Sequence, residues 1–296
     1  MCGTVSKEHQ ESRNLTMADS VVAEANNATD HLLSTVTKSL GGISVDDTAA
    51  GDMVEMVDTA AALSKMLDGL DGVPTQPPSL YFDLEGESLS RHGSISILQL
   101  HVLPSKRTYL VDVHTLQHTA FSTCGKNGRS LKEILECDGI PKVFFDVRND
   151  SDALYSHFNI SLAGVQDLQL MELATRTFSK RFVNGLSRCI ERDVCLSVQE
   201  LAAWKAVKDA GVKLFAPEYG GSYKVFAKRP LCDAIKLYCA QDVQILPRLW
   251  SHYSSRMSPA WTMKVHRASK ERVALSQTAN YNGKGPHKAL APPGWY

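Results

Sequence analysis

Three short apolar runs separated by polar turns follow one another in the first half of the chain. They cover Leu80–Glu85, residues 95–102 and residues 107–113, with the segments "GESLSRHGS" and "LPSK" between them. Short runs of alternating apolar positions bounded by Gly, Ser and Pro are typical of β-strands joined by turns. The pattern predicts three successive strands paired as a meander.

The apolar spacing then changes. Residues 131–137 and 150–157 have the spacing of helices, and the apolar run 142–145 between them predicts a buried strand. A meander followed by strand–helix alternation is typical of an α/β domain with a mixed sheet.

Helical spacing dominates the rest of the chain. Ser197 and Glu200 form a capping-box pair that opens a helix, which we expect to end at Gly211. Another helix is expected over residues 231–253, bent near Pro247 because proline lacks the backbone N–H that a helix interior needs.

Two extensions flank the predicted domain. Residues 1–52 form an acidic leader rich in Ser, Thr, Ala and Asn, expected to be mostly flexible. From Met53, apolar residues at helical spacing predict an amphipathic helix that ends near Gly69 and opens a domain over residues 53–257. Residues 258–296 are expected to form a C-terminal helix and a Gly/Pro-rich tail, which is either disordered or an extended strap on the domain.

Charge is unevenly distributed along the chain, although it carries 32 basic and 32 acidic residues in total. Residues 1–75 hold four basic and twelve acidic residues, whereas residues 76–296 hold 28 basic and 20 acidic ones, a net charge of +8. A basic body is compatible with a polyanionic ligand such as nucleic acid.

Cysteine usage and hydropathy predict an intracellular protein. The seven cysteines are irregularly spaced and form no Cys-x-x-Cys pair, so they favour reduced thiols over a disulfide framework or a zinc site. No stretch approaches the roughly twenty apolar residues that cross a bilayer, and a secretory signal pattern is absent. We expect no membrane association and a nuclear or cytoplasmic location.

Carboxylates lie at the ends of three predicted elements. Asp83 and Glu85 are two residues apart in a strand, so their side chains point to the same face about 6.6 Å apart. Asp150 follows the strand 142–145 at a helix start, and Tyr238 and Asp242 are four apart on one helical face. Taken singly, these are typical of a solvated sheet edge, a helix N-terminal acid and a core tyrosine.

Together, the carboxylates indicate a metal site. Hard divalent cations such as Mg²⁺ prefer oxygen ligands from separate elements. Two such ions roughly 4 Å apart can stabilise both the attacking and the leaving oxygen in phosphodiester hydrolysis, and a nearby tyrosine hydroxyl could orient the attacking water.

These motifs resemble those of the DEDD superfamily of 3′-to-5′ exonucleases, and the chain is similar to ribonuclease D and to Werner-type exonuclease domains from about residue 54 to residue 253. The first motif is "YFDLEG", the second is "KVFFDVRNDSDALY", and the third, "YCAQDV", has the Tyr-x-x-x-Asp pattern of the tyrosine subclass. The histidine subclass is rejected because position 237 is Leu.

The resemblance implies a ribonuclease-H-like fold, a mixed five-stranded sheet flanked by helices. It also implies a site in which Asp83, Glu85, Asp150 and Asp242 bind two Mg²⁺ or Mn²⁺ ions and Tyr238 orients the water. Asp146, four residues before Asp150, is the alternative third acid. The implied reaction is hydrolysis of phosphodiester bonds at single-stranded nucleic acid ends.

The segments "FFDVRNDSDAL" and "GGSYKVFAKRPL" are similar to the Egalitarian-like, exonuclease-domain-containing branch of the family. Some members of that branch have lost acids and act as RNA-binding adaptors, so an inactive nucleic-acid-binding adaptor with the same fold is the alternative function. A purely structural domain is a third hypothesis.

Basic residues interleaved with aromatic residues occur in "RTFSKRFVNGLSRCIER" and "GGSYKVFAKRP". Such interleaving suits single-stranded nucleic acid, whose phosphates are neutralised and whose bases stack. We expect Lys224, Lys228 and Arg229 to line the approach to the acidic site. The alternative is a solvated basic face with its aromatic residues in the core. No residue pattern distinguishes RNA from DNA as the ligand.

Overall fold

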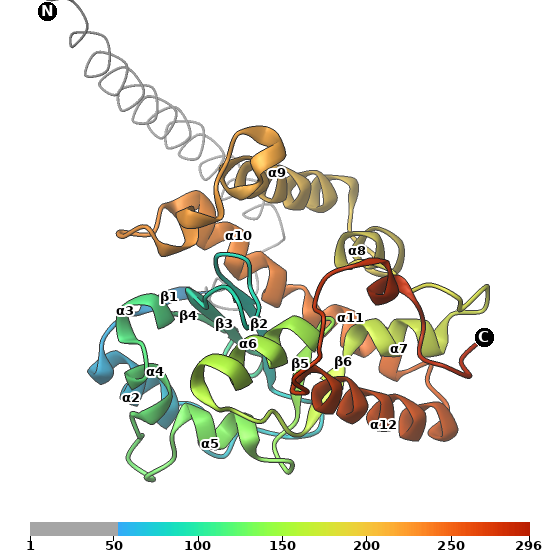
Figure 1. The fold of residues 1–296 in the computed structure, drawn as a ribbon, viewed down its shortest axis with the longest axis horizontal. Coiled ribbons are helices and arrows are strands. Elements are labelled where there is room, and N and C mark those ends of the chain that lie inside the picture. Colours follow the sequence, from blue (N-terminus) through green and yellow to red (C-terminus); the bar gives the residue numbers. More distant parts are fainter. Residues whose placement is uncertain (1–52) are drawn as a thin grey trace, which may run out of the picture.

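The computed structural model describes residues 53–296. The predicted acidic leader, residues 1–52, lies outside the described residues. The described chain forms an α/β structure in which helices flank a central mixed sheet (Figure 1). This confirms the predicted fold class.

Within the described residues the sheet has six strands in the order β1-β4-β3-β2-β5-β6. Strands β2, β3 and β4 pair antiparallel as the predicted meander, whereas β1, β5 and β6 join it in parallel. The strands are β1 Met53–Val57, β2 Leu80–Glu85, β3 Ile97–Val102, β4 Arg107–Val111, β5 Lys142–Phe144 and β6 Val165–Asp167.

The sheet has one strand more than the five expected, and the prediction that a helix begins at Met53 is wrong. Met53–Val57 is a strand, paired in parallel with β4, and helix α2 begins only at Ala60. The Thr59 hydroxyl accepts a hydrogen bond from the Ala62 N–H at 3.2 Å and so caps this helix. Pairing with the open edge of β4 outweighs the helical spacing of a run as short as five residues.

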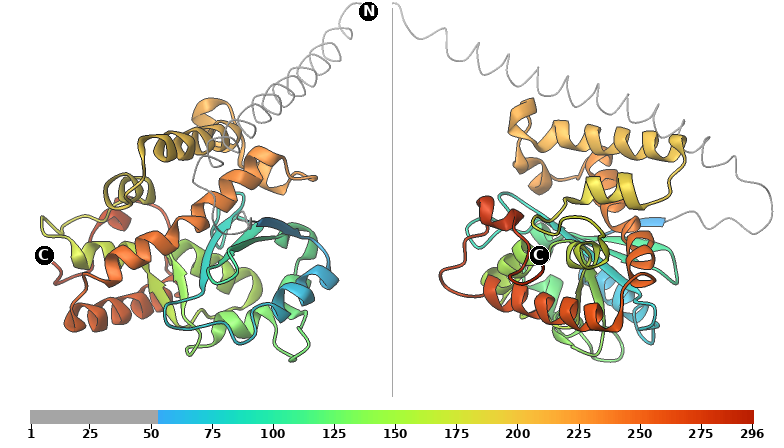
Figure 2. Two further views of the ribbon diagram at one scale, coloured as in Figure 1. Left: turned by 180° about the vertical axis from the view of Figure 1, so that it is seen from behind. Right: turned by 90° about the vertical axis from the view of Figure 1, so that its right-hand side faces the viewer.

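The two faces of β2 have different roles. Phe82 and Leu84 pack into the apolar core on one face, whereas Asp83 and Glu85 point to the other, as the period of two predicts. Helix α10, Asp233–Gln244, crosses that second face, as Figure 2 shows from behind. An apolar cluster that includes Ile97 and Ile235 joins the helix to the sheet there.

The helices follow the predicted segments with two changes of boundary. The capping box of Ser197 and Glu200 is present, but the helix that it opens, α9 Val198–Phe215, continues beyond Gly211. The single helix expected over residues 231–253 is divided at Ile245 into α10 and α11, because a proline stands in the first turn of α11. Helix α2 ends at Asp68, and α11 spans Leu246–Ser254. The remaining α-helices are α3 Val113–Leu116, α4 Thr119–Ser122, α5 Leu131–Glu136, α6 Arg148–Phe158, α7 Leu168–Thr175, α8 Leu186–Asp193 and α12 Pro259–Ser276. The 3₁₀ helices are η1 Pro217–Tyr219, η2 Tyr223–Ala227 and η3 Pro286–Ala289.

The Gly/Pro-rich tail runs back over the domain (Figure 1). The Val183 N–H donates to the Ala289 carbonyl at 2.9 Å, and the Ala291 N–H donates to the Arg181 carbonyl at 3.0 Å. Farther along, Trp295 is buried against Trp261 of α12. Of the two possibilities for the tail, the structure shows the strap.

Candidate active site

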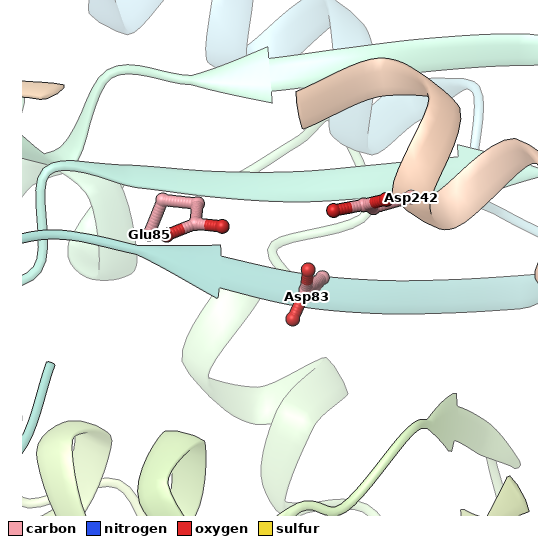
Figure 3. A group of neighbouring side chains, drawn as sticks. All are labelled: Asp83, Glu85 and Asp242. Carbon is pink, nitrogen blue, oxygen red and sulfur yellow. The ribbon is translucent and has the colours of Figure 1, made fainter. Parts of the chain in front are cut away.

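Three of the predicted site carboxylates converge on the α10 face of the sheet. Asp83, Glu85 and Asp242 each offer one carboxylate oxygen, and these oxygens lie within 4.8 Å of one another. Figure 3 shows Asp83 and Glu85 on the same strand and Asp242 reaching toward them from the helix. The strand period and the crossing of α10 over β2 bring together residues separated by more than 150 positions in sequence.

Asp150 is in the first turn of α6, close enough to this cluster for its charge to act on Glu85. Its side chain is buried, and its Oδ1 atom has no hydrogen-bond partner within residues 53–296. The charge of Asp83 is close enough to raise the pKa of the Asp150 carboxyl, after the larger effect of burial. A buried carboxylate oxygen without a partner is costly, which makes this atom a candidate ligand.

Asp146, the alternative third acid, is paired with arginine side chains. Both of its oxygens accept hydrogen bonds from Arg148, at 2.5 and 2.7 Å, and Arg272 lies at 3.6 Å. Burial raises the pKa of Asp146, but these arginines together lower it below its usual range. The carboxylate of Asp146 thus joins α6 to α12, whereas Oδ1 of Asp150 has no hydrogen-bond partner among residues 53–296.

The acidic cluster is electrostatically strained in the absence of a cation. Burial, with a further contribution from Asp242, raises the pKa of Asp83 to about 7. The pKa of Glu85 is raised well above its usual value, first by burial and then by the charge of Asp83. Burial also raises the pKa of Asp242. Mutual repulsion of this kind is relieved by protonation or by a bound cation.

Tyr238 lies one helical turn before Asp242 and shares its surroundings. The pKa of its phenol is raised far above 10 by burial and by the nearby carboxyl groups, foremost Glu85. The hydroxyl therefore stays protonated throughout the physiological pH range.

Lys208 of α9 is the site residue that sequence reasoning missed. Its Nζ atom donates to Asp242 Oδ2 at 2.6 Å and to the Tyr238 hydroxyl at 3.2 Å. Gly211, on the same face of α9, lies so close to Tyr238 that a Cβ atom would be 2.5 Å from the ring. In the sequence, the only local indication of Lys208 is its position three residues before Gly211, a spacing that is common in helices.

The residues present fit a hard divalent cation. Three carboxyl groups converge from β2 and α10, and Oδ1 of both Asp150 and Asp242 has no hydrogen-bond partner in the described part of the chain. Oxygen ligands of this kind suit Mg²⁺ or Mn²⁺.

The segment that holds the predicted nucleic-acid-binding residues packs beside Tyr238, because Phe226 of η2 lies 6.3 Å from that ring. Lys224 is in η2 and Lys228 is the residue that ends it. Arg229 is bound by Asp112, with Nε at 2.6 Å from Oδ2 and Nη2 at 2.5 Å from Oδ1. This arginine anchors the segment after η2 to the end of β4, so its guanidinium is held by a carboxylate.

A family model described as 3′-5′ exonuclease matches residues 54–257, more than half of the chain and the part that holds the acidic cluster. The chain belongs to the 3′-5′ exonuclease family. Members of this family are hydrolases of nucleic acid, and the acidic cluster described above lies where β2 and α10 meet. No curated protein sequence matches the chain.

Solved structures of exonucleases share the fold. Ribonuclease D from Trypanosoma brucei in complex with RNA U12 is 21% identical, with a TM-score of 0.66 over 82% of this chain and 78% of that one. The same protein with GMP gives 0.65 at 21% identity, over 82% and 70%. The catalytic core of Rrp6 from T. brucei gives 0.54 at 13% identity, over 77% and 53%. The ribonuclease-H-like fold of the exonuclease family is thereby confirmed.

None of the helices in residues 53–296 combines the length and apolar character needed to cross a membrane.

Proposed function

We propose that this exonuclease removes nucleotides from the 3′ ends of single-stranded nucleic acid in a reaction that depends on two divalent ions, Mg²⁺ or Mn²⁺. The observation that carries the proposal is the convergence of carboxylate oxygens from Asp83, Glu85 and Asp242 within 4.8 Å. Asp150 completes the proposed ligand set, because its unpaired oxygen lies beside this cluster whereas Asp146 is bound by arginine.

In this proposed reaction the carboxylates bind the metal ions. Divalent ions held there would lower the pKa of a water nucleophile and stabilise charge on the leaving oxygen. The side chains of β2, α6 and α10 belong to three rigid elements, so the ligand geometry is set before substrate binds. Ligands on rigid elements lose little conformational entropy when the site fills.

Tyr238 is proposed to position the water. Its raised pKa keeps the hydroxyl protonated, so it orients the nucleophile by hydrogen bonding and does not remove its proton. This proposed role, with Leu at position 237, supports the tyrosine subclass of the DEDD superfamily. The likeness to the Egalitarian-like branch remains a prediction from the sequence.

Nucleic acid as the substrate is supported by ribonuclease D, the similar protein solved with RNA and with GMP. In this chain, Phe178 is half exposed, and the guanidinium groups of Arg176 and Arg192 lie 5.1 and 5.3 Å from its ring centre. The half-exposed ring suits base stacking, whereas the two guanidinium groups are already paired with Glu172. Lys224 and Lys228 are proposed to add phosphate contacts.

The test uses RNA and DNA strands labelled at the 5′ end, incubated with purified protein and Mg²⁺, Mn²⁺ or EDTA. We expect a ladder shortened one nucleotide at a time from the 3′ end with metal, and none with EDTA or with Asp83→Ala. Asp150→Asn is expected to abolish shortening, and Asp146→Asn to retain it if the protein folds. Intact strands under every metal condition, with strand binding retained, would instead support the adaptor.

A further inference from the structure

The ammonium group of Lys208 lies inside the acidic site. It contacts Asp242 Oδ2 at 2.6 Å and lies 4.3 Å from the ring centre of Tyr238. The side chain of Asp242 is 4% exposed and that of Lys208 is 20% exposed, so the ion pair is largely shielded from water. Screening is weak at such a position, and the charges act strongly on each other.

Helix α9 is held in place independently of this ion pair. Its N-terminus is closed by the capping box of Ser197 and Glu200. Three residues after Lys208, Gly211 lets the helix backbone approach the ring of Tyr238 closely. Helix packing therefore fixes the Cα atom of Lys208, while its four-carbon stem remains free to move the ammonium.

Lys208 and a divalent ion require the same carboxylate. An ion bound by Asp242 lies about 2 Å from its oxygen, whereas the ammonium is 2.6 Å from Oδ2 of that group. Two cations so close together repel each other strongly where water is scarce. An ion bound at Oδ1 of Asp242, the oxygen that Lys208 leaves without a partner, therefore weakens the contact between Lys208 and Oδ2.

A substrate phosphate offers a new partner for the displaced ammonium. The phosphodiester that enters the site carries a negative charge, and lysine binds phosphate as a mobile point charge. We propose that Lys208 exchanges Asp242 for a phosphate oxygen of the nucleic acid when divalent ions and substrate enter. Lys208 is then a substrate-binding residue that occupies the cation position while the site is empty. This inference rests on the proposed function.

The first experiment measures metal affinity without nucleic acid. Mn²⁺ is titrated into wild-type protein, Lys208→Met and Lys205→Met, and free Mn²⁺ is followed by electron paramagnetic resonance. Lys205 is a matched control, because it lies on the same helix but pairs with Glu191 on the surface, where both side chains are more than 40% exposed. We expect Lys208→Met to bind Mn²⁺ about tenfold more tightly, the factor for one hydrogen bond between charged groups, and Lys205→Met to match the wild type.

The second experiment measures phosphate binding with metal present. The probe is a nucleoside 5′-monophosphate added as an inhibitor of strand shortening, and its inhibition constant is compared between the same proteins at saturating Mn²⁺. We expect about tenfold weaker inhibition for Lys208→Met, since one charge-assisted contact is lost, and no change for Lys205→Met. A purely structural lysine would weaken both metal and nucleotide binding, so the opposite signs of the two changes identify the exchange.

The results that overturn the inference are specific. Unchanged or weaker Mn²⁺ binding by Lys208→Met refutes competition for Asp242, and an unchanged inhibition constant refutes the phosphate contact. If Lys208→Met does not fold, Lys208→Gln replaces it with the same expected signs, and Lys208→Arg, which keeps the charge, should remain close to the wild type. Failure of the wild-type protein to bind Mn²⁺ and to shorten any strand overturns the proposed function and this inference together. Active wild-type protein with unaltered variants overturns the inference alone.

Discussion

Replacing Asp83 by Asn removes one negative charge from the acidic cluster and keeps the shape of the side chain. In metal-free protein the pKa of Asp83 is raised from 3.8 to about 7, chiefly by burial and then by Asp242. The folded protein therefore holds a proton on this carboxyl at pH values where the unfolded chain has released it. As the pH rises from about 4 to 7, ionisation of Asp83 opposes folding, and the free energy of unfolding falls.

The size of the effect follows from the two pKa values. The rise from 3.8 to about 7, at about 1.4 kcal/mol for each tenfold change in the proton affinity, corresponds to at most about 4 kcal/mol. Asp83 is partly exposed, so solvent screening reduces this figure, and we expect Asp83→Asn to stabilise the metal-free protein by about 1 to 2 kcal/mol at pH 8. The gain should shrink toward zero as the pH is lowered to about 4.

The assay is urea unfolding in EDTA at pH 5 and pH 8, followed by circular dichroism. Asp146→Asn is the matched control with the opposite sign, because Arg148 and Arg272 hold that carboxylate and lower its pKa. This variant should be less stable than the wild type at pH 8. The reasoning fails if Asp83→Asn is destabilised at pH 8, or if its effect on stability is the same at both pH values.

Three further predictions concern the reaction itself. Tyr238→Phe should lower kcat about 100-fold, the cost of a misplaced nucleophile, with Mn²⁺ affinity unchanged; an unaltered kcat would remove Tyr238 from the mechanism. Gly211→Ala places a Cβ atom 2.5 Å from the Tyr238 ring, so kcat should fall and the thermal midpoint should drop, whereas Gly139→Ala, with its nearest atom at 3.8 Å, should resemble the wild type in both measurements. Metal binding requires ionised carboxyl groups, so Mn²⁺ affinity measured from pH 5.5 to 8.5 should rise through pH 7, near the pKa of Asp83; a flat profile would contradict the raised pKa.

The carboxylates could be predicted from sequence because their spacing is local. Asp83 and Glu85 share a face by the period of a strand, and Tyr238 and Asp242 by the period of a helix. Asp150 was ambiguous, since Asp146 also follows β5 closely. The difference between them depends chiefly on Arg148, whose guanidinium binds both oxygens of Asp146, and secondarily on Arg272, more than 100 residues away. The sequence does not show to which carboxylate Arg148 turns.

The contacts of the basic residues were not predictable in the same way. Lys208 meets Asp242 across 34 positions, and Arg229 meets Asp112 across 117. Neither pair has a local spacing, because each depends on how helices pack against the sheet. The lysine and arginine patterns of the sequence indicate net charge but do not show which cations are already bound by acids.

Short strands were the weakest part of the fold prediction. Met53–Val57 has apolar residues that fit a helix as well as a strand, and Val165–Asp167 has only three residues. Both strands exist because a parallel neighbour offers unpaired backbone groups. That requirement is set by the assembled sheet and leaves little trace in the local sequence.

The most direct test of the central claim is diffraction from crystals of the protein soaked in Mn²⁺, recorded where manganese scatters anomalously. The account predicts anomalous peaks between Asp83, Glu85 and Asp242, with Asp150 within coordination distance of one of them and Asp146 still bound to Arg148. Crystals that diffract well and show no peak at this cluster, or a peak coordinated by Asp146 in place of Asp150, would contradict it.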